Sequence, residues 1–152
     1  MFSRPSVKYL AHIISGEGVK VDTSKLEVVK NWPVPKTVKQ VKSFLGFIGY
    51  YRKYIYQFAK KATVLHNLLR KEVNWEWTDQ CQKAFELLRD SMLSAPILAF
   101  ADMNKEFILT TDASKEAIGF VLSQIGPDGK EHPISYSGRS LRKSEKNWGV
   151  MD

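Results

Sequence analysis

One stretch of the sequence carries the side chains expected of a surface that binds polyanions. Between Val28 and Lys71 there are ten Lys or Arg residues and no Asp or Glu. Cationic side chains that contact phosphates release condensed counterions, so such a stretch favours nucleic-acid binding. A solvated cationic face and a contact with an anionic membrane surface are alternatives that charge alone leaves open.

The strongest predicted helix lies inside this stretch, from Thr37 to about Ile55. Its apolar stripe, at spacings of three, four and seven and widened by aromatic residues, consists of Val38, Val41, Leu45, Ile48 and Ile55 with Phe44, Phe47, Tyr51 and Tyr54. The candidate nucleic-acid-binding residues on another side are Lys39, Lys42, Gly46, Gly49, Tyr50 and Lys53. Such a helix could lie along a duplex, with lysines on phosphates and Tyr50 against sugars or bases.

The two glycines of this helix need an explanation, because glycine in a helix interior costs about 1 kcal/mol relative to alanine. Gly46 and Gly49 would let another backbone approach closely. That neighbour could be a nucleic-acid groove or a second helix packed inside the protein. The residues alone give the two interpretations about equal weight.

A single carboxylate, Asp112, is the candidate metal-binding and catalytic residue. It ends a predicted strand over Glu106–Asp112. Mg²⁺ prefers oxygen ligands, and two-metal hydrolysis needs several acids close together. An isolated Asp after a strand is more often a turn residue, so the position carries little by itself.

The bulk composition predicts a folded chain with an uneven charge. Of the 152 residues, 43% are apolar and 12% aromatic, and the net charge is +7. Residues 1–76 hold 14 basic and five acidic residues, whereas residues 77–152 hold nine and eleven. No apolar run approaches the roughly 18 residues of a membrane span, and no signal-peptide pattern opens the chain. With Cys81 as the single cysteine, we expect an intracellular location, cytoplasmic or nuclear.

The remaining patterns predict the order of the elements. We expect a hairpin from strands over 7–14 and 19–21, helices over 22–32, 37–55, 62–70 and 78–93, and an antiparallel meander over 106–112, 118–124 and 134–137. Thr37 and Gln40 fit a capping box, and Thr78 caps the helix after it. Ser144 is expected to begin a helix that is cut at Asp152, and a domain boundary is expected near Pro96.

Several motifs follow one another in the order and spacing of one family. They are Tyr9-Leu10-Ala11-His12 with Gly18-Val19; Trp32-Pro33-x-Pro35-x-Thr37; Val41-x-Ser43-Phe44-Leu45-Gly46-x-x-Gly49-Tyr50-Tyr51-Arg52; Trp75-x-Trp77-Thr78 with Cys81 and Ala84-Phe85; Ser94-Ala95-Pro96-x-Leu98; Thr111-Asp112-Ala113-Ser114; Gly119-x-Val121-Leu122-Ser123-Gln124; and Glu145-Lys146-Asn147. Nearly the whole chain therefore resembles gypsy-type LTR-retrotransposon reverse transcriptases, from the thumb into ribonuclease H.

The resemblance implies an α+β fold in three segments. Residues 1–22 resemble a palm-edge hairpin, 23–95 a helical thumb, and 96–152 an incomplete ribonuclease-H-like antiparallel sheet. It implies that Leu10, Ala11 and His12 correspond to the primer grip, although the family usually has glycine where Ala11 stands. It also implies that Lys42, Gly46 and Tyr50 follow the minor groove of a template–primer duplex.

The same resemblance implies that Asp112 is one of four carboxylates that hold Mg²⁺ in the parent enzyme, and that its partners lie beyond Asp152. The two adjacent aspartates of the family's polymerase site are absent from this chain. We therefore expect binding to an RNA–DNA hybrid or DNA duplex, association with the rest of the Pol polyprotein, no membrane contact, no bound cofactor and no catalysis by this chain alone. Completion of an active site by a partner chain and a co-opted protein-interaction module are the alternatives.

Overall fold

The computed structural model describes residues 6–9 and 12–141, which form four α-helices and two three-stranded antiparallel sheets. In chain order the elements are β1 Ser6–Tyr9, β2 His12–Ser15, β3 Gly18–Val21, α1 Thr23–Lys30, α2 Val38–Gly49, the 3-10 turn η1 Arg52–Tyr54, α3 Phe58–Asn67, α4 Asp79–Leu93, β4 Ile108–Ala113, β5 Ala117–Ile125 and β6 Glu131–Ser140. The predicted α+β class is confirmed. The helix expected from Ser144 lies outside the described residues.

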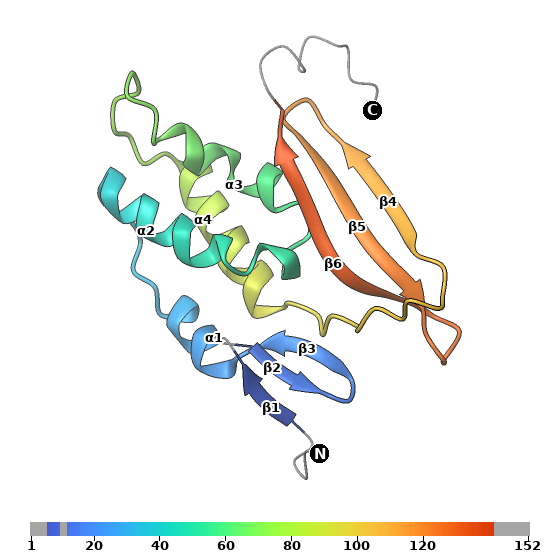
Figure 1. The fold of residues 1–152 in the computed structure, drawn as a ribbon. Coiled ribbons are helices and arrows are strands. Elements are labelled where there is room, and N and C mark those ends of the chain that lie inside the picture. The colour runs from blue at the N-terminus through green and yellow to red at the C-terminus, as the bar shows by residue number, and fades with distance from the viewer. Residues whose placement is uncertain (1–5, 10–11, 142–152) are drawn as a thin grey trace.

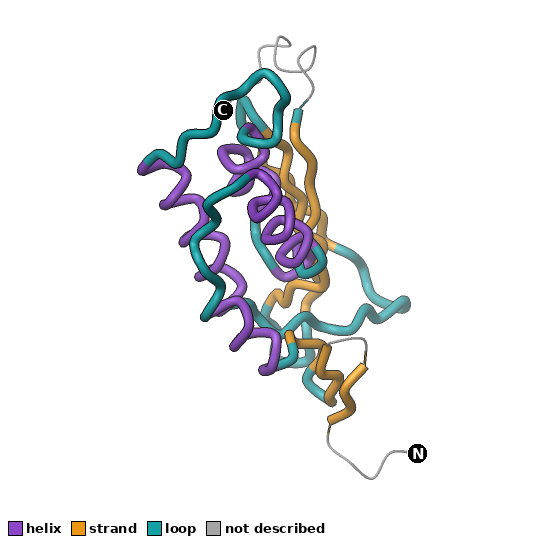
Figure 2. Tube along the Cα trace, turned by 90° about the vertical axis from the view of Figure 1, so that its left-hand side faces the viewer, coloured by secondary structure: helices purple, strands orange, loops and turns teal. Residues whose placement is uncertain are grey.

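The helices and the C-terminal sheet form two layers. α3 and η1 pack against the β4–β6 sheet, and α4 packs against α3 (Figure 1). Turned by a quarter, the molecule shows its long helices on one side of these strands, with the small β1–β3 sheet at one end (Figure 2). Residues 23–95 are therefore in contact with the described residues 96–141, and the division of the chain into three segments stays a prediction.

Aromatic and aliphatic side chains of α2, α3 and α4 build the main core. Phe44 and Phe85 are fully buried, with ring centroids 4.7 Å apart. The same cluster includes Ile48, Leu65 and Leu88, each with no exposed surface. The core thus fixes which side of α2 faces inward.

The N-terminal region has one strand more than predicted. The expected strand over 7–14 is two strands, β1 and β2, which pair antiparallel with Tyr9 opposite His12. β2 also pairs with β3, placing His12 opposite Val21. The prediction was wrong because no Gly, Pro, Asn or Asp stands between Tyr9 and His12 in the sequence to signal a turn.

α2 begins as predicted but ends early. The Gln40 N–H donates to Thr37 Oγ1 at 3.1 Å, whereas the Gln40 side chain accepts from the Lys36 N–H at 2.7 Å, so only half of the expected capping box forms. The helix was predicted to extend to about Ile55 and instead ends at Gly49. The Tyr51 N–H bonds to Ile48 O at 3.0 Å, a tightened turn that brings Tyr51, Tyr54 and Ile55 into the core. Val38, predicted in the apolar stripe, is 37% exposed.

Two other helices differ from their predicted bounds. α1 is capped by Asp22, which accepts from the Ser24 N–H at 3.1 Å, and it ends at Lys30 rather than at Trp32. α3 covers Phe58–Asn67 rather than 62–70, and the side chain of its N-cap accepts no hydrogen bond from the first turn of the helix. That N-cap, Gln57, has a left-handed backbone with φ 53°. Because no side chain caps α3, no local pattern of residues indicates where this helix begins.

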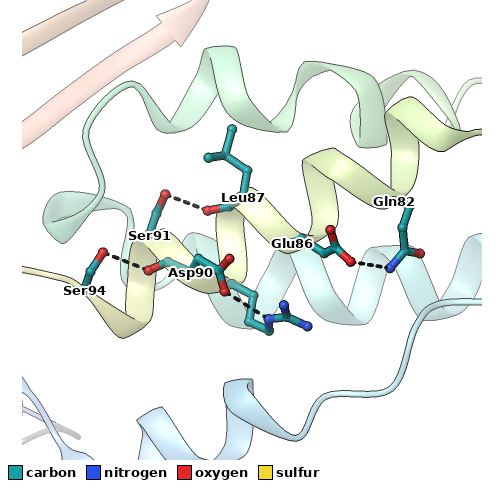
Figure 3. Close-up of polar contacts among 7 residues, drawn as sticks. Gln82, Glu86, Leu87, Asp90, Ser91 and Ser94 are labelled. Atoms are coloured by element: carbon teal, nitrogen blue, oxygen red, sulfur yellow. Dashed lines mark hydrogen bonds and ion pairs between the residues drawn. The ribbon is translucent and has the colours of Figure 1, made fainter.

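α4 matches its prediction and carries several hydrogen-bonded polar side chains. Thr78 accepts from the Cys81 N–H at 3.2 Å, which fixes the first turn. Along the helix, Gln82 donates to Glu86 at 3.0 Å, and Ser91 and Ser94 donate to the carbonyl oxygens of Leu87 and Asp90 (Figure 3). Leu87, a large apolar residue of the same helix, is 48% exposed.

The C-terminal sheet is the predicted meander, in the order β4-β5-β6. Asp112 pairs with Gly119, and Gly119 pairs with Gly138 on β6. A side chain at Gly119 would lie in van der Waals range of Gln57. The start of α3 therefore sits directly over the strand position that faces Asp112.

Candidate nucleic-acid interface

The outer side of α2 forms an exposed surface of lysine, glycine and tyrosine. Lys39, Lys42, Gly46 and Tyr50 recur at spacings of three and four and are all exposed. Tyr50, at the C-cap of the helix, is 55% exposed although it is a large aromatic residue. We call these four residues the α2 face. Lys53 is also exposed, on η1, with Nζ 5.5 Å from the centroid of the Tyr54 ring.

The space above Gly46 separates the two interpretations of the glycines. A Cβ atom added at Gly46 would meet nothing within 4 Å, so no described segment packs against it. At Gly49 the Cβ would touch only the Phe58 ring at 3.9 Å, an ordinary contact. Helix packing within the described residues therefore does not account for Gly46. Of the two interpretations, close approach by a neighbour outside the described residues is the one that remains.

His12 links the N-terminal sheet to the end of α2. Its ring stacks on Tyr50 with centroids 5.6 Å apart and planes 18° apart, and on Tyr54 at 5.6 Å and 29°. His12 Nδ1 and the Tyr54 hydroxyl form a 2.8 Å hydrogen bond. The structure thus joins one predicted primer-grip residue, His12, to one predicted groove residue, Tyr50. Leu10 and Ala11 lie outside the described residues.

The environment of this cluster favours uncharged rings. Burial, and secondarily the positive charge of Lys53, lower the pKa of His12 below 6.5. Burial, with the neighbouring Tyr51 and Tyr50, raises the pKa of Tyr54 to about 12. At neutral pH, His12 is therefore an uncharged aromatic partner and not another cation of the surface.

Asp112 lies apart from this cluster, on the sheet. Its Oδ2 accepts a hydrogen bond from the Tyr56 hydroxyl at 3.2 Å and another from the Gln57 side-chain amide. Burial raises the pKa of Tyr56, and the hydrogen bond and charge of Asp112 raise it further. Asp112 therefore acts here as an acceptor that joins the start of α3 to β4.

The described residues do not fit the Mg²⁺ that the resemblance implies. Among residues 6–9 and 12–141, no group of three or more His, Cys, Asp or Glu could hold a metal ion. The Tyr56 hydroxyl and the Gln57 side-chain amide both donate to Oδ2 of Asp112. A cation bound at this oxygen would have to displace these two donors.

Three residues of these sites were not predicted as site residues. Tyr56 and Gln57 lie 56 and 55 positions from Asp112 in the sequence, and no local pattern indicates a contact over that distance. Tyr54 was assigned to the core, where it does lie, but its hydroxyl also holds His12. The spacing of Tyr50, Tyr51 and Tyr54 was the one signal that could have suggested an aromatic cluster.

The sequence and the fold correspond to a known class of protein. Residues 77–152 match the family described as an RNase H-like domain found in reverse transcriptase, and the chain belongs to this family. It corresponds to the reverse transcriptase and ribonuclease H region of retrotransposon Pol polyproteins. This finding confirms the resemblance drawn from the motifs.

Two relatives illustrate the similarity in sequence. The chain is 38% identical over 146 residues to the retrovirus-related Pol polyprotein from transposon 412 of Drosophila melanogaster, covering 96% of this chain and 12% of the relative. It is 35% identical over 151 residues to the transposon Tf2-3 polyprotein of Schizosaccharomyces pombe, covering 99% and 11%. The chain thus spans about an eighth or less of the length of these relatives.

The solved structures show the same fold at lower identity. A foamy viral protease–reverse transcriptase in complex with double-stranded DNA matches with a TM-score of 0.79 and 21% identity, over 94% of this chain and 30% of that chain. Another, in complex with an RNA/DNA hybrid, matches with a TM-score of 0.77 and 21% identity, over 94% of this chain and 19% of that chain.

In the described part of this chain, no helix has the length and apolar character of a membrane span.

Proposed function

We propose that this chain binds nucleic-acid duplexes without sequence preference, through the α2 face and Lys53, within a retrotransposon Pol protein. The observation that carries the proposal is the open space above Gly46, flanked by Lys42 and Tyr50 on an exposed helix side. A glycine there brings the helix backbone close to a groove, while the lysines reach phosphates.

The charge distribution supports the same surface. The acid-free stretch from Val28 to Lys71 includes α2 and α3, so no carboxylate within that stretch opposes phosphates. The foamy viral relatives in fold were solved with a DNA duplex and with an RNA/DNA hybrid. We therefore propose both duplex types as ligands. The proposal includes that a longer Pol protein containing this chain carries out reverse transcription and degrades the RNA strand of RNA–DNA hybrids.

A salt titration with a labelled RNA–DNA hybrid tests the proposal. Nonspecific affinities are typically ~10⁻⁴–10⁻⁶ M at physiological salt, and the logarithm of the affinity should fall linearly with the logarithm of salt. Lys39→Ala should reduce that slope by about one unit. Lys83→Ala, which removes an exposed lysine of α4, is the matched control and should leave the slope unchanged. A salt-independent affinity would contradict the electrostatic account and favour a protein-interaction module.

A further inference from the structure

His12 occupies a central position in the N-terminal sheet. β2 pairs with β1 on one side and with β3 on the other, so the backbone of His12 is held opposite both Tyr9 and Val21. Val21 is 4% exposed and belongs to the main core. The His12 side chain therefore leaves a backbone position that the sheet has already fixed.

Three tyrosines contact the His12 ring, and two of them, Tyr50 and Tyr54, stack on it. Tyr54 is 1% exposed, and its hydroxyl lies 2.8 Å from His12 Nδ1. Tyr50 stacks on the same ring, and the edge of Tyr51 lies against Tyr50 with centroids 5.0 Å apart and planes at 83°. Stacked and edge-to-face aromatic pairs have preferred geometries, so these contacts restrict how the Tyr50 ring can lie.

The location of Tyr50 makes this restriction important. Tyr50 is the C-cap of α2, where the helix ends and the chain turns into η1. A side chain at a helix end has fewer neighbours on its own helix, and more than half of Tyr50 is exposed. Without His12, the Tyr50 ring would lose the partner that lies almost parallel to it.

We propose that His12 is a positioning residue for nucleic-acid binding: it fixes the Tyr50 ring on the α2 face and joins the β1–β3 sheet to that face. This inference rests on the proposed function of the α2 face. His12 acts through Tyr50 and the buried Tyr54 hydroxyl. The lowered pKa of His12 agrees with this role, because a neutral ring stacks without adding charge.

A double-mutant cycle on the full 152-residue chain tests the proposal, with a labelled RNA–DNA hybrid as the probe. The proteins are wild type, His12→Ala, Tyr50→Ala and the double variant, with thermal melting recorded for each. Each single variant should weaken binding by about threefold or more, and the double variant should bind no more weakly than Tyr50→Ala. His66→Ala, which removes the exposed histidine of α3, is the matched control and should bind as wild type does.

Two conservative variants separate positioning from folding. His12→Phe keeps a ring between the tyrosines and should retain binding within about twofold. Tyr54→Phe removes only the hydroxyl and should produce a smaller loss than His12→Ala. If His12→Ala does not fold, the cycle is measured with His12→Gln, which removes the ring and keeps a polar side chain.

The outcomes distinguish this inference from the proposed function. Additive losses in the double variant, or wild-type binding by His12→Ala, overturn the positioning role while the α2 face remains an interface. Absence of hybrid binding by the wild-type chain overturns the proposed function, and the positioning role with it.

Discussion

The helical region and the C-terminal sheet bury their apolar side chains to very different degrees. In the helices, Phe44, Phe85, Leu88 and Met92 have no exposed surface. In and around the sheet, Leu109 is 62% exposed and Ile125 is 45% exposed, while the buried residues include the polar Ser123 and Gln124. The helical region thus holds a core of its own, and the described sheet depends on α3 and η1 for its cover.

This difference explains why binding is assigned to one region. A helix whose inner side is locked in a core can present its outer side as a rigid surface, and the α2 face is such a surface. The sheet instead contributes Asp112 as an acceptor for Tyr56 and Gln57.

The largest expected effect is on stability. Phe85→Ala should lower the free energy of unfolding by about 3–5 kcal/mol, because it leaves a cavity beside Phe44. Leu109→Ala should change it by less than about 0.5 kcal/mol, because that side chain is mostly exposed. Chemical denaturation followed by circular dichroism gives both values. Similar losses for the two variants would show that the regions are equally packed.

The next effect separates the surface of α2 from its core. Gly46→Leu should weaken hybrid binding about tenfold, on the order of 1.4 kcal/mol, because the new side chain keeps the helix away from a groove. Gly46→Ala should retain most of the binding and stabilise the helix by about 1 kcal/mol. Melting curves and binding isotherms of both variants are compared. If Gly46→Leu lowers the melting temperature sharply, the glycine serves packing instead.

A smaller effect tests the link between the sheet and α3. Asp112→Asn removes the carboxylate charge that helps to raise the pKa of Tyr56. We therefore expect the Tyr56 pKa to fall toward 10.0, while stability changes by no more than about 1 kcal/mol, the net value of an ordinary hydrogen bond. NMR titration of the tyrosine ring carbons measures this pKa. An unchanged value would mean that Tyr56 does not contact Asp112 in solution.

The smallest effect concerns pH. The pKa of His12 is lowered in the folded chain, so the unfolded chain binds the proton more tightly. The melting temperature should therefore fall as the pH drops below about 6.5, the ordinary value, until the folded His12 is also protonated. His12→Phe should show a weaker decline between pH 7 and 5. If wild type and His12→Phe show the same dependence of melting temperature on pH, then His12 does not cause the decline.

The sequence predicted the local features of both regions better than their contacts. Thr37 and Thr78 identified the starts of α2 and α4, because capping depends on residues three apart. The end of α2 was missed because burial of Tyr51, Tyr54 and Ile55 outweighs the helical pattern that continues through them.

The candidate interface likewise combines local features that the sequence predicted with long-range contacts that it did not. The exposed side of α2 follows from helical spacing, so Lys39, Lys42, Gly46 and Tyr50 could be predicted together. The stacking of His12 on Tyr50 joins positions 38 apart, and the bonds of Asp112 join positions 55 and 56 apart. Contacts of this kind depend on how whole elements pack, which no local pattern in a single sequence specifies.

The central claim is that the α2 face binds duplex nucleic acid. Its most direct test is a titration of the ¹⁵N-labelled chain with an unlabelled RNA–DNA hybrid, following the backbone amide resonances. The account predicts that the largest shifts occur at Lys39, Lys42, Gly46 and Tyr50, and that they disappear as salt is raised. Shifts confined to β4–β6 or to α4, with α2 unaffected, would contradict it.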